Sequence, residues 1–333
     1  MQPDNKFPQT LHEAIQFFAR EDNAFDFMVN LRWAYGVECP RCESKEVSFI
    51  SSRKVWECKH CKTKKQFSAK VGTIFEDSPV GLDKWFCAIW LLVNAKNGIS
   101  SYELHRSLGV TQKTAWFMLQ RIRVAMRTGS FKKMSGHVEA DETFIGAKAR
   151  NLSPGRRAAR GGDASFRKTA VLGLLERNTV ESSSRVHLKV VESVRRFDLD
   201  PEVRERVEKG SNVYTDKLRS YEKLADNYVH QVIDHAECYA KGLVHTNGLE
   251  NFWSLLKRAI RGTYVNVEPF HLFRYLDEQA FRFNERKDND AGRFIKAAVG
   301  IIGKGLRYAE LTGKGAKEGE TVLPPPSMPW ETA

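Results

Sequence analysis

The sequence lacks the long apolar run that a membrane span requires. No segment approaches the roughly 20 consecutive apolar residues of a spanning helix. The first ten residues, "MQPDNKFPQT", lack the basic-then-apolar order of a signal peptide, and the chain has no internal repeat. These absences predict a soluble, cytoplasmic protein associated with the nucleoid, without a membrane partner and without disulfides.

Acidic residues are too few to balance the basic ones. The chain has 53 Lys and Arg against 41 Asp and Glu, so its formal net charge is +12 and its pI is about 9.4. This surplus indicates an anionic partner; nucleic acid is the commonest, and an anionic membrane surface is the competing interpretation. The 333 residues, 41% of them hydrophobic, suffice for two or three domains with their own cores.

Cysteines are also few, and four of the six form two C-x-x-C pairs. Fifteen residues separate the pair Cys39 and Cys42 from the pair Cys58 and Cys61, which is the spacing of two zinc knuckles. Each knuckle directs two thiolates at one ion, so both together predict a closed, structural zinc site. We expect a zinc ribbon at residues 37–70, after an N-terminal helical segment at 1–36. Between Cys39 and Phe67 the ribbon carries eight Lys or Arg and three Glu, which favours DNA contact, although a solvated basic face would have the same composition.

Residues 80–130 are predicted to form a helical DNA-binding domain. An almost wholly apolar stretch from Leu82 to Val93 indicates a buried helix, and "SSYELHRSLGVTQKTAWFMLQRIRVAM" then has helix-turn-helix proportions, with Thr111 as an N-cap. An ordinary helical hairpin with a basic surface is the alternative. In the DNA-reading version, four side chains lie outside and contact bases or phosphates: Gln112, Lys113, Arg121 and Arg123.

From residue 137 the pattern changes to strands, some of which carry acids. "HVEADETFIG" alternates apolar and acidic residues and includes Asp141, while "SNVYTD" is a short apolar strand that ends at Asp216. In "HTNGLENFWSLLKR", Glu250 and Lys257 lie two helical turns apart along the edge of an apolar stripe. Asn247 is a possible alternative ligand, or Asn247 and Glu250 could simply cap their own helix.

Two strand aspartates and a helix glutamate suit two divalent cations, because hard cations prefer oxygen ligands. The predicted chemistry is phosphoryl transfer at a phosphodiester with two Mg²⁺ ions, for which Mn²⁺ would substitute. Lys257 would contact the DNA backbone near the scissile bond. The order of three strands, helix, strand, helix, strand and helix predicts a ribonuclease H-like α/β catalytic domain at 136–300, and residues 303–333 read as a disordered tail. The predicted fold class is α+β and multidomain.

Several segments together resemble the zinc-ribbon insertion-sequence transposases of the bacterial DDE class. They are "LRWAYGVECPRC", "VGTIFEDSPVGLDKWFCAIWLL", "LGVTQKTAWFMLQRIR", "DETFIGAK", "VYTDKLRSY" and "HTNGLENFWSLLKR". The resemblance implies binding to the terminal inverted repeats of an element, followed by cleavage and transfer to target DNA. It places the first two catalytic aspartates at Asp141 and Asp216, excludes Glu142 as a ligand, and leaves Glu250 and Asn247 open as the third.

The same resemblance implies a dimer or higher assembly on double-stranded DNA, because two element ends must be held together. Two other functions are compatible with the residues. One is a non-catalytic regulator in which the zinc ribbon and the helix-turn-helix bind DNA. The other is a structure-selective nuclease on the same fold, which would cut without joining.

Overall fold

A computed structural model of the chain describes residues 7–127, 132–146, 168–180, 182–216, 219–233 and 244–313. The chain divides into two compact units, of which the first contains Met1–Thr128 and Asp288–Ala333 and the second contains Gly129–Lys287. Among the described helices, none is both long and apolar enough to cross a membrane.

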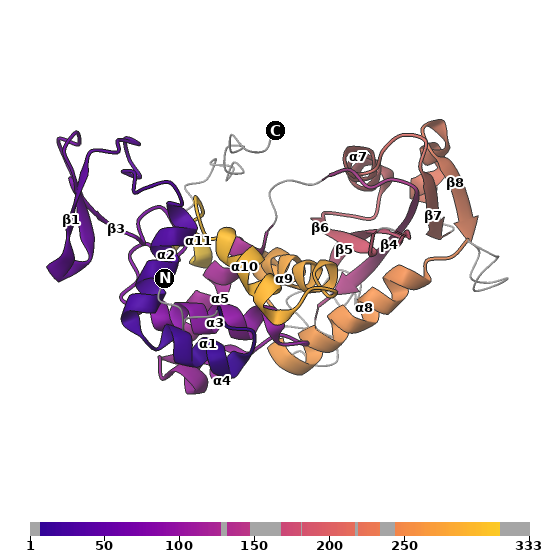
Figure 1. Cartoon of the computed structure of the whole chain (residues 1–333). Helices are drawn as coiled ribbons and strands as arrows, with labels where there is room; N and C mark the ends of the chain where they lie inside the picture. The colour runs from indigo at the N-terminus through magenta and orange to yellow at the C-terminus, as the bar shows by residue number, and fades with distance from the viewer. Residues whose placement is uncertain are drawn as a thin grey trace. The chain divides into compact units, whose positions relative to one another are not determined.

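The first unit begins with two helices, followed by a small antiparallel sheet on which the second helix packs (Figure 1). A capping box between Thr10 and Glu13 starts the first helix. The elements are α1 (Leu11–Phe18), α2 (Glu21–Arg32), β1 (Val47–Ile50), β2 (Val55–Cys58) and β3 (Gln66–Ser68). Trp56 of β2 stacks on Phe25 of α2 at a ring distance of 5.7 Å and on Phe67 of β3 at 5.9 Å. Helix α2 and the ribbon therefore share one aromatic core.

The helical part of the first unit follows the predicted pattern. Helix α3 (Leu82–Asn94) is buried along most of its length, as its apolar sequence indicated. Helices α4 (Ser101–Leu108) and α5 (Gln112–Met126) are joined by a short turn in which Gly109 has a φ of +60°, a conformation that favours glycine. The Thr111 hydroxyl caps α5 by accepting a hydrogen bond from the backbone N–H of Thr114 at 3.1 Å.

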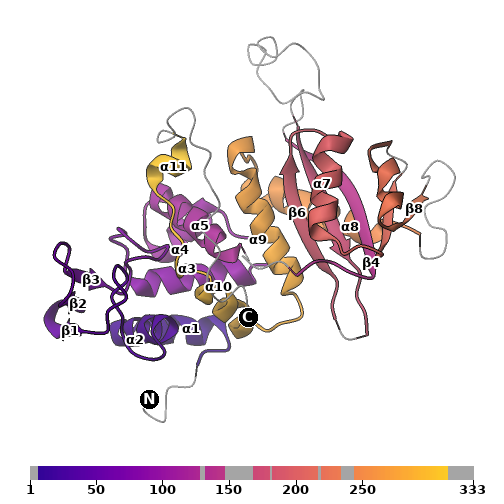
Figure 2. The ribbon, with the colours of Figure 1, turned by 90° about the horizontal axis from the view of Figure 1, so that it is seen from above.

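The C-terminal part of the chain returns to this first unit. Helix α10 (Asp290–Val299) packs beside α1 and α3 (Figure 2), and its Phe294 is fully buried among aromatic rings. The second unit therefore ends at Lys287, earlier than the predicted boundary at residue 300.

The predicted tail also begins too early. Leu306, and Leu311 of helix α11 (Tyr308–Thr312), are buried, so residues 303–313 belong to the packed first unit. The rest of that prediction, residues 314–333, lies outside the part of the chain that the structure describes.

The second unit is built on a mixed five-stranded sheet of order β6-β5-β4-β7-β8. Its strands are β4 (His137–Ile145), β5 (Thr169–Glu176), β6 (Arg185–Val191), β7 (Asn212–Asp216) and β8 (Val229–Ile233). The first three pair antiparallel, whereas β7 pairs parallel with both β4 and β8. This parallel pairing brings the middle of β4, which carries Asp141, near the end of β7, which carries Asp216.

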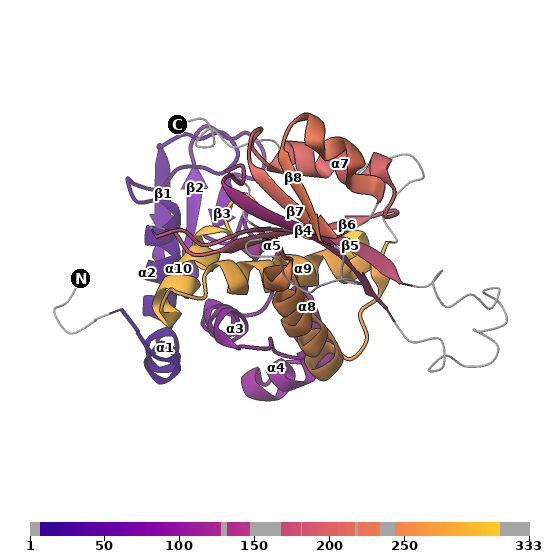
Figure 3. The ribbon, with the colours of Figure 1, turned by 90° about the vertical axis from the view of Figure 1, so that its right-hand side faces the viewer.

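Helices cover both faces of this sheet (Figure 3). One face carries α7 (Arg196–Arg206) and the 3-10 helix η4 (Arg219–Asp226), and the other carries α8 (Asn247–Ala259), the π-helical turn η5 (Ile260–Tyr264), the 3-10 turn η6 (Pro269–His271) and α9 (Leu272–Asn284). The order of strands and helices is the one predicted from the sequence, except that the helix predicted between β7 and β8 is the 3-10 helix η4. In β4, Val138 and Ala140 join the core under α7. Because side chains alternate along a strand, Glu139 and Asp141 lie on the opposite face, toward α8.

Candidate metal centre and active site

The four paired cysteines converge on one point of the ribbon. Their sulfur atoms all lie within 4.8 Å of one another, and the closest pairs are 3.5 Å and 3.7 Å apart. A tetrahedron with Zn–S bonds of about 2.3 Å has edges of about 3.8 Å, so this spacing fits one zinc ion. Within the described ranges, these cysteines are the only group of three or more His, Cys, Asp or Glu side chains placed to hold a metal ion, so Asp141, Asp216 and Glu250 do not form such a group.

The local backbone prepares one cysteine for metal binding. Burial disfavours the Cys58 thiolate, but the backbone N–H groups of Cys61 and His60 donate to the sulfur and lower the pKa of Cys58 to about 6. The thiolate is the form that binds metals. The imidazole of His60 turns to Glu46 instead, with Nε2 3.4 Å from Oε1, so His60 lies outside the ligand set.

The two predicted aspartates lie side by side in the second unit. The parallel pairing of β4 with β7 ends at Glu139 and Tyr214, and Asp141 and Asp216 each follow two residues later, close enough for the charge of Asp216 to act on Asp141. Both side chains lie on the face that α8 covers. The carboxylate of Asp141 accepts a hydrogen bond from Trp253 Nε1 of α8 at 2.8 Å.

The electrostatics of this pair favour a bound cation. Burial raises the pKa of Asp141, and the negative charges of Asp216 and Glu250 raise it further. The buried Oδ1 of Asp216 has no hydrogen-bond donor among the described residues. A buried carboxylate oxygen without a donor is costly, and a divalent cation would satisfy it and relieve the repulsion. The two aspartates therefore offer oxygen donors that suit a divalent metal, although Glu250 does not converge with them on one point.

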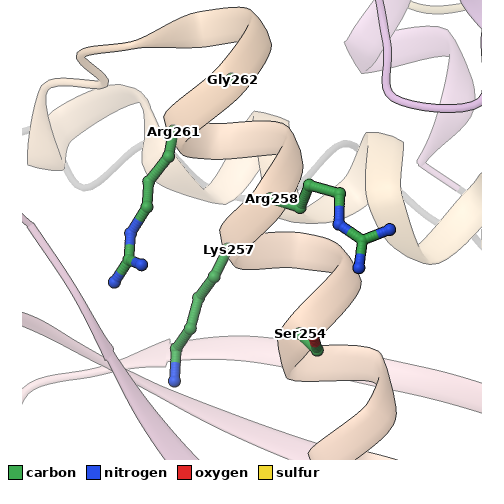
Figure 4. A pocket seen from close by; sticks show the side chains of 5 residues that line it. All are labelled: Ser254, Lys257, Arg258, Arg261 and Gly262. Carbon is green, nitrogen blue, oxygen red and sulfur yellow. The ribbon is translucent and has the colours of Figure 1, made fainter.

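Both candidates for the third ligand lie in the first turn of α8 and are exposed. The helix begins at Asn247 after the N-cap residue Thr246, so the alternative in which Asn247 caps its own helix is wrong. The carboxylate of Glu250 is close enough to influence the pKa of Asp141. Lys257, two turns further along α8, is half-buried and lines a shallow surface pocket (Figure 4).

Glu142 faces the other way, as predicted. It accepts a hydrogen bond from the hydroxyl group of Tyr221, which belongs to the core under α7. Burial, followed by the charges of Asp141 and Asp216, raises the pKa of Glu142 to about 8. It is thus separated from Asp141 by the plane of the sheet while remaining in its electric field.

Sequence reasoning assigned no role to Glu139. This side chain is 1% exposed; Oε2 accepts from the backbone N–H of Leu249 at 2.9 Å, and Oε1 accepts from Arg177 Nε at 2.8 Å. A Cβ atom at Gly248 would lie 2.8 Å from Glu139 Oε2, so glycine allows this approach. Glu139 therefore fixes the N-terminus of α8 to the sheet. The available signal was its spacing of two from Asp141, which places both acids on one face.

A glycine allows the Trp253 ring to lie against the sheet. Gly173 of β5 pairs directly with Asp141, and a Cβ atom there would lie 2.5 Å from the ring of Trp253. An isolated glycine inside an apolar strand is a recognised sign of such close approach. Gly173 thus makes room for the indole group that donates to Asp141.

The prediction that Arg121 and Arg123 lie outside is wrong, because both are buried. The guanidinium group of Arg121 donates to the backbone carbonyls of Ile74 at 2.8 Å, Glu76 at 2.7 Å and Leu306 at 3.0 Å. It joins segments that are distant in sequence, which no local pattern indicates. Of the other two, Lys113 is exposed, and Gln112 is half-buried and donates to the hydroxyl of Ser101 at 2.8 Å.

Comparison with known proteins supports the assignment of the chain to the transposase class. A model of the ISXO2-like transposase domain matches residues 133–284, and a model of the transposase zinc-ribbon domain matches residues 19–64. The chain is 30% identical over 257 residues to an uncharacterized protein in transposable element ISH50 of Halobacterium salinarum, covering 73% of this chain and 84% of the relative. It is 36% identical over 119 residues to an uncharacterized transposase-like protein of Haemophilus influenzae, covering 35% of this chain and 90% of that protein. The chain belongs to the ISXO2-like transposase family.

Proposed function

We propose that the chain is a DDE transposase that binds the terminal inverted repeats of an insertion sequence, cleaves the DNA there and transfers the strand to target DNA. The observation that carries this proposal is the placement of Asp141 beside Asp216 on one face of the sheet, under a helix that supplies Glu250 and Lys257. Such a group of carboxylates is what metal-dependent phosphodiester chemistry requires.

In this proposal Asp141, Asp216 and Glu250 hold two Mg²⁺ ions, with Asn247 as the alternative third ligand. The ions, or Mn²⁺ in their place, would activate the attacking oxygen and stabilise the leaving oxygen. Trp253 orients the carboxylate of Asp141 through its Nε1 hydrogen bond, and Lys257 contacts a backbone phosphate near the scissile bond.

The remaining parts of the proposal concern DNA recognition. The strand order β6-β5-β4-β7-β8 supports a ribonuclease H-like fold for the second unit. The zinc ribbon and the pair α4–α5 would bind the element ends, with Gln112 and Lys113 as the remaining candidates for contact on α5. Because two ends must be held together for joining, the active form would be a dimer or a higher assembly on DNA.

Replacing either aspartate with asparagine tests the proposal. Asp141→Asn and Asp216→Asn should slow cleavage of the element end by more than about a thousandfold, a loss of about 4 kcal/mol of transition-state stabilisation. Binding to end DNA should remain, because the ribbon and α4–α5 are unchanged. The measurements are cleavage of a labelled end duplex with Mg²⁺ and fluorescence anisotropy for binding.

Two outcomes would replace this function with another. If Asp216→Asn leaves every measurable activity intact, the protein is a DNA-binding regulator. If the wild-type protein cuts branched DNA in an Asp216-dependent way but never yields joined products, it is a structure-selective nuclease.

A further inference from the structure

Three cations on the last turns of α8 and the start of η5 do not pair with any other described residue. Lys257, Arg258 and Arg261 make no ion pair or hydrogen bond with any described residue, and the two arginines are exposed. Arginines elsewhere in this unit bind acids, for example Arg177 with Glu139 and Arg204 with Asp200. Cations near the C-terminal end of α8 are stabilised modestly by the helix dipole. The dipole alone does not explain why these cations line a groove.

These cations surround a shallow, open groove on the outer side of the helix. The groove has a volume of about 520 Å³ and is lined by Ser254, Lys257, Arg258, Arg261 and Gly262. Lys257 and Arg261 extend to one side of the helix and Arg258 extends to the other (Figure 4). Positive side chains therefore flank a strip of helix surface from two sides, and the hydroxyl of Ser254 adds a donor along it.

The π-helical turn η5 contributes to this alignment. Residues four apart in an α-helix are offset around its axis, but the wider i→i+5 turn that begins at Ile260 brings Arg261 closer to alignment with Lys257. The two residues are separated by a rise of about 6 Å along the helix, which long side chains can bridge to neighbouring phosphates of one strand. Such turns occur frequently at functional sites.

Gly262 keeps the floor of the groove free of a side chain. A Cβ atom at this position would meet nothing within 4 Å, and its φ is not in the left-handed region. Neither packing nor backbone conformation therefore requires glycine here. A glycine that the fold does not need, between unpaired cations, is suited to close approach of a ligand backbone.

We propose that this groove, defined by Ser254, Lys257, Arg258, Arg261 and Gly262, binds the phosphate backbone of the element-end duplex next to the cleavage point. The inference rests on the proposed function and extends it from Lys257 to Arg258, Arg261 and Gly262. The end duplex is chosen as the partner for two reasons. The groove begins on the helix of Glu250, two turns from that residue, and the element end must be cut before it is joined to target DNA. Arg261 is a positioning residue here and holds the strand on which Lys257 acts.

The first test compares Arg261→Gln and Arg258→Gln with Lys209→Gln. Lys209 is exposed and lies before the start of β7, at the end of that strand opposite to Asp216, so its loss removes one charge away from the groove. Binding of the full-length protein is measured by anisotropy at several salt concentrations, with a duplex carrying the terminal repeat that flanks its own gene. Each groove variant should reduce the slope of log K against log salt by about 0.9, whereas Lys209→Gln should not.

The second measurement is cleavage of this duplex at saturating protein. Arg261→Gln should cut about tenfold more slowly, because a misplaced phosphate reacts slowly even when the DNA is bound. Gly262→Leu should weaken binding and cleavage while the thermal unfolding midpoint stays the same or rises, since a Cβ at this position would meet no atom within 4 Å and leucine favours a helix more than glycine does.

The outcomes separate this inference from the proposed function. If the groove variants match Lys209→Gln in slope and cleavage while the wild-type protein cuts, the groove inference is overturned and the transposase proposal stands. If the wild-type protein never cuts but the groove variants still lower the slope, the groove binds DNA and the proposed reaction fails. Normal cleavage with slow joining of pre-cut ends would overturn the choice of partner and assign the groove to target DNA.

Discussion

At the scale of single residues, the second unit uses acids for two different purposes. Asp141 and Asp216 lie side by side with their charges in conflict, which suits a cation site. Glu139, on the same strand and face as Asp141, instead pairs with Arg177 and accepts from the N-terminus of α8. A carboxylate at a helix N-terminus is favoured by the helix dipole, so Glu139 holds α8 in place. The strand pattern identified both acids, but only tertiary contacts separate their roles.

Glu139→Gln should therefore destabilise the protein without removing a metal ligand. Glutamine can still accept from Leu249, but the nearly buried Arg177 loses its counter-charge, which should cost about 2–3 kcal/mol of unfolding free energy. Chemical denaturation followed by circular dichroism measures this loss. The control is Glu205→Gln, which removes a half-exposed acid paired with the neighbouring Arg206 and should change stability by less than about 0.5 kcal/mol. Equal effects of the two changes would contradict a special role for Glu139.

At the scale of elements, the ribbon is stabilised from two sides. The four cysteines close it at one end, and Trp56 joins β2 to α2 and β3 through stacked rings. A three-stranded sheet of this size has little apolar area of its own, so a metal contributes directly to its folding. The sequence predicted the cysteine cluster well, because the spacing of the knuckles is local. It did not predict that α2 completes the ribbon core, since the aromatic side chains of Phe25 and Trp33 are separated from the ribbon strands along the chain.

Removing zinc should unfold the ribbon and weaken DNA binding. Cys58→Ser, or a strong chelator, should reduce bound zinc from one ion per chain to none and abolish the near-ultraviolet signal of the Trp56 cluster, because the stacking depends on the closed ribbon. Metal analysis and circular dichroism measure these effects. Cys87→Ala is the matched control, because Cys87 lies in α3 outside the cysteine cluster, and it should keep one zinc ion. Retention of the tryptophan signal after complete zinc loss would contradict a structural role for the metal.

At the scale of the whole molecule, the chain leaves its first unit and returns to it. Residues from Asp288 onward complete the helical core of the N-terminal unit, and Arg121 ties α5 to the carbonyl of Leu306. Amphipathic patterns identified the elements and their order, because these depend on residues close in sequence. They could not assign Arg121 to the interior or α10 to the first unit, since both depend on contacts between segments that are distant in sequence. The positive charge of Arg121 and Arg123 led to the prediction that they contact DNA, although both are buried.

This return predicts that the first unit cannot be released in folded form by cutting the chain before α10. The ring of Phe294 lies 5.5 Å from that of Phe18, 5.7 Å from Phe27 and 5.1 Å from Trp90, all in the first unit. Phe294→Ala should therefore lower the unfolding free energy of this unit by about 3–5 kcal/mol, because it leaves a large cavity in a well-packed core.

Deleting residues 288–333 should remove cooperative unfolding of the first unit and its DNA binding, although it removes no residue proposed to contact DNA. Deleting only 314–333 is the matched control and should preserve both, because the described packing of α10 and α11 ends before residue 314. Thermal denaturation and anisotropy with end DNA measure the two properties. A stable, DNA-binding fragment that ends at residue 287 would show that α10 is dispensable and that the first unit folds from its N-terminal segment alone.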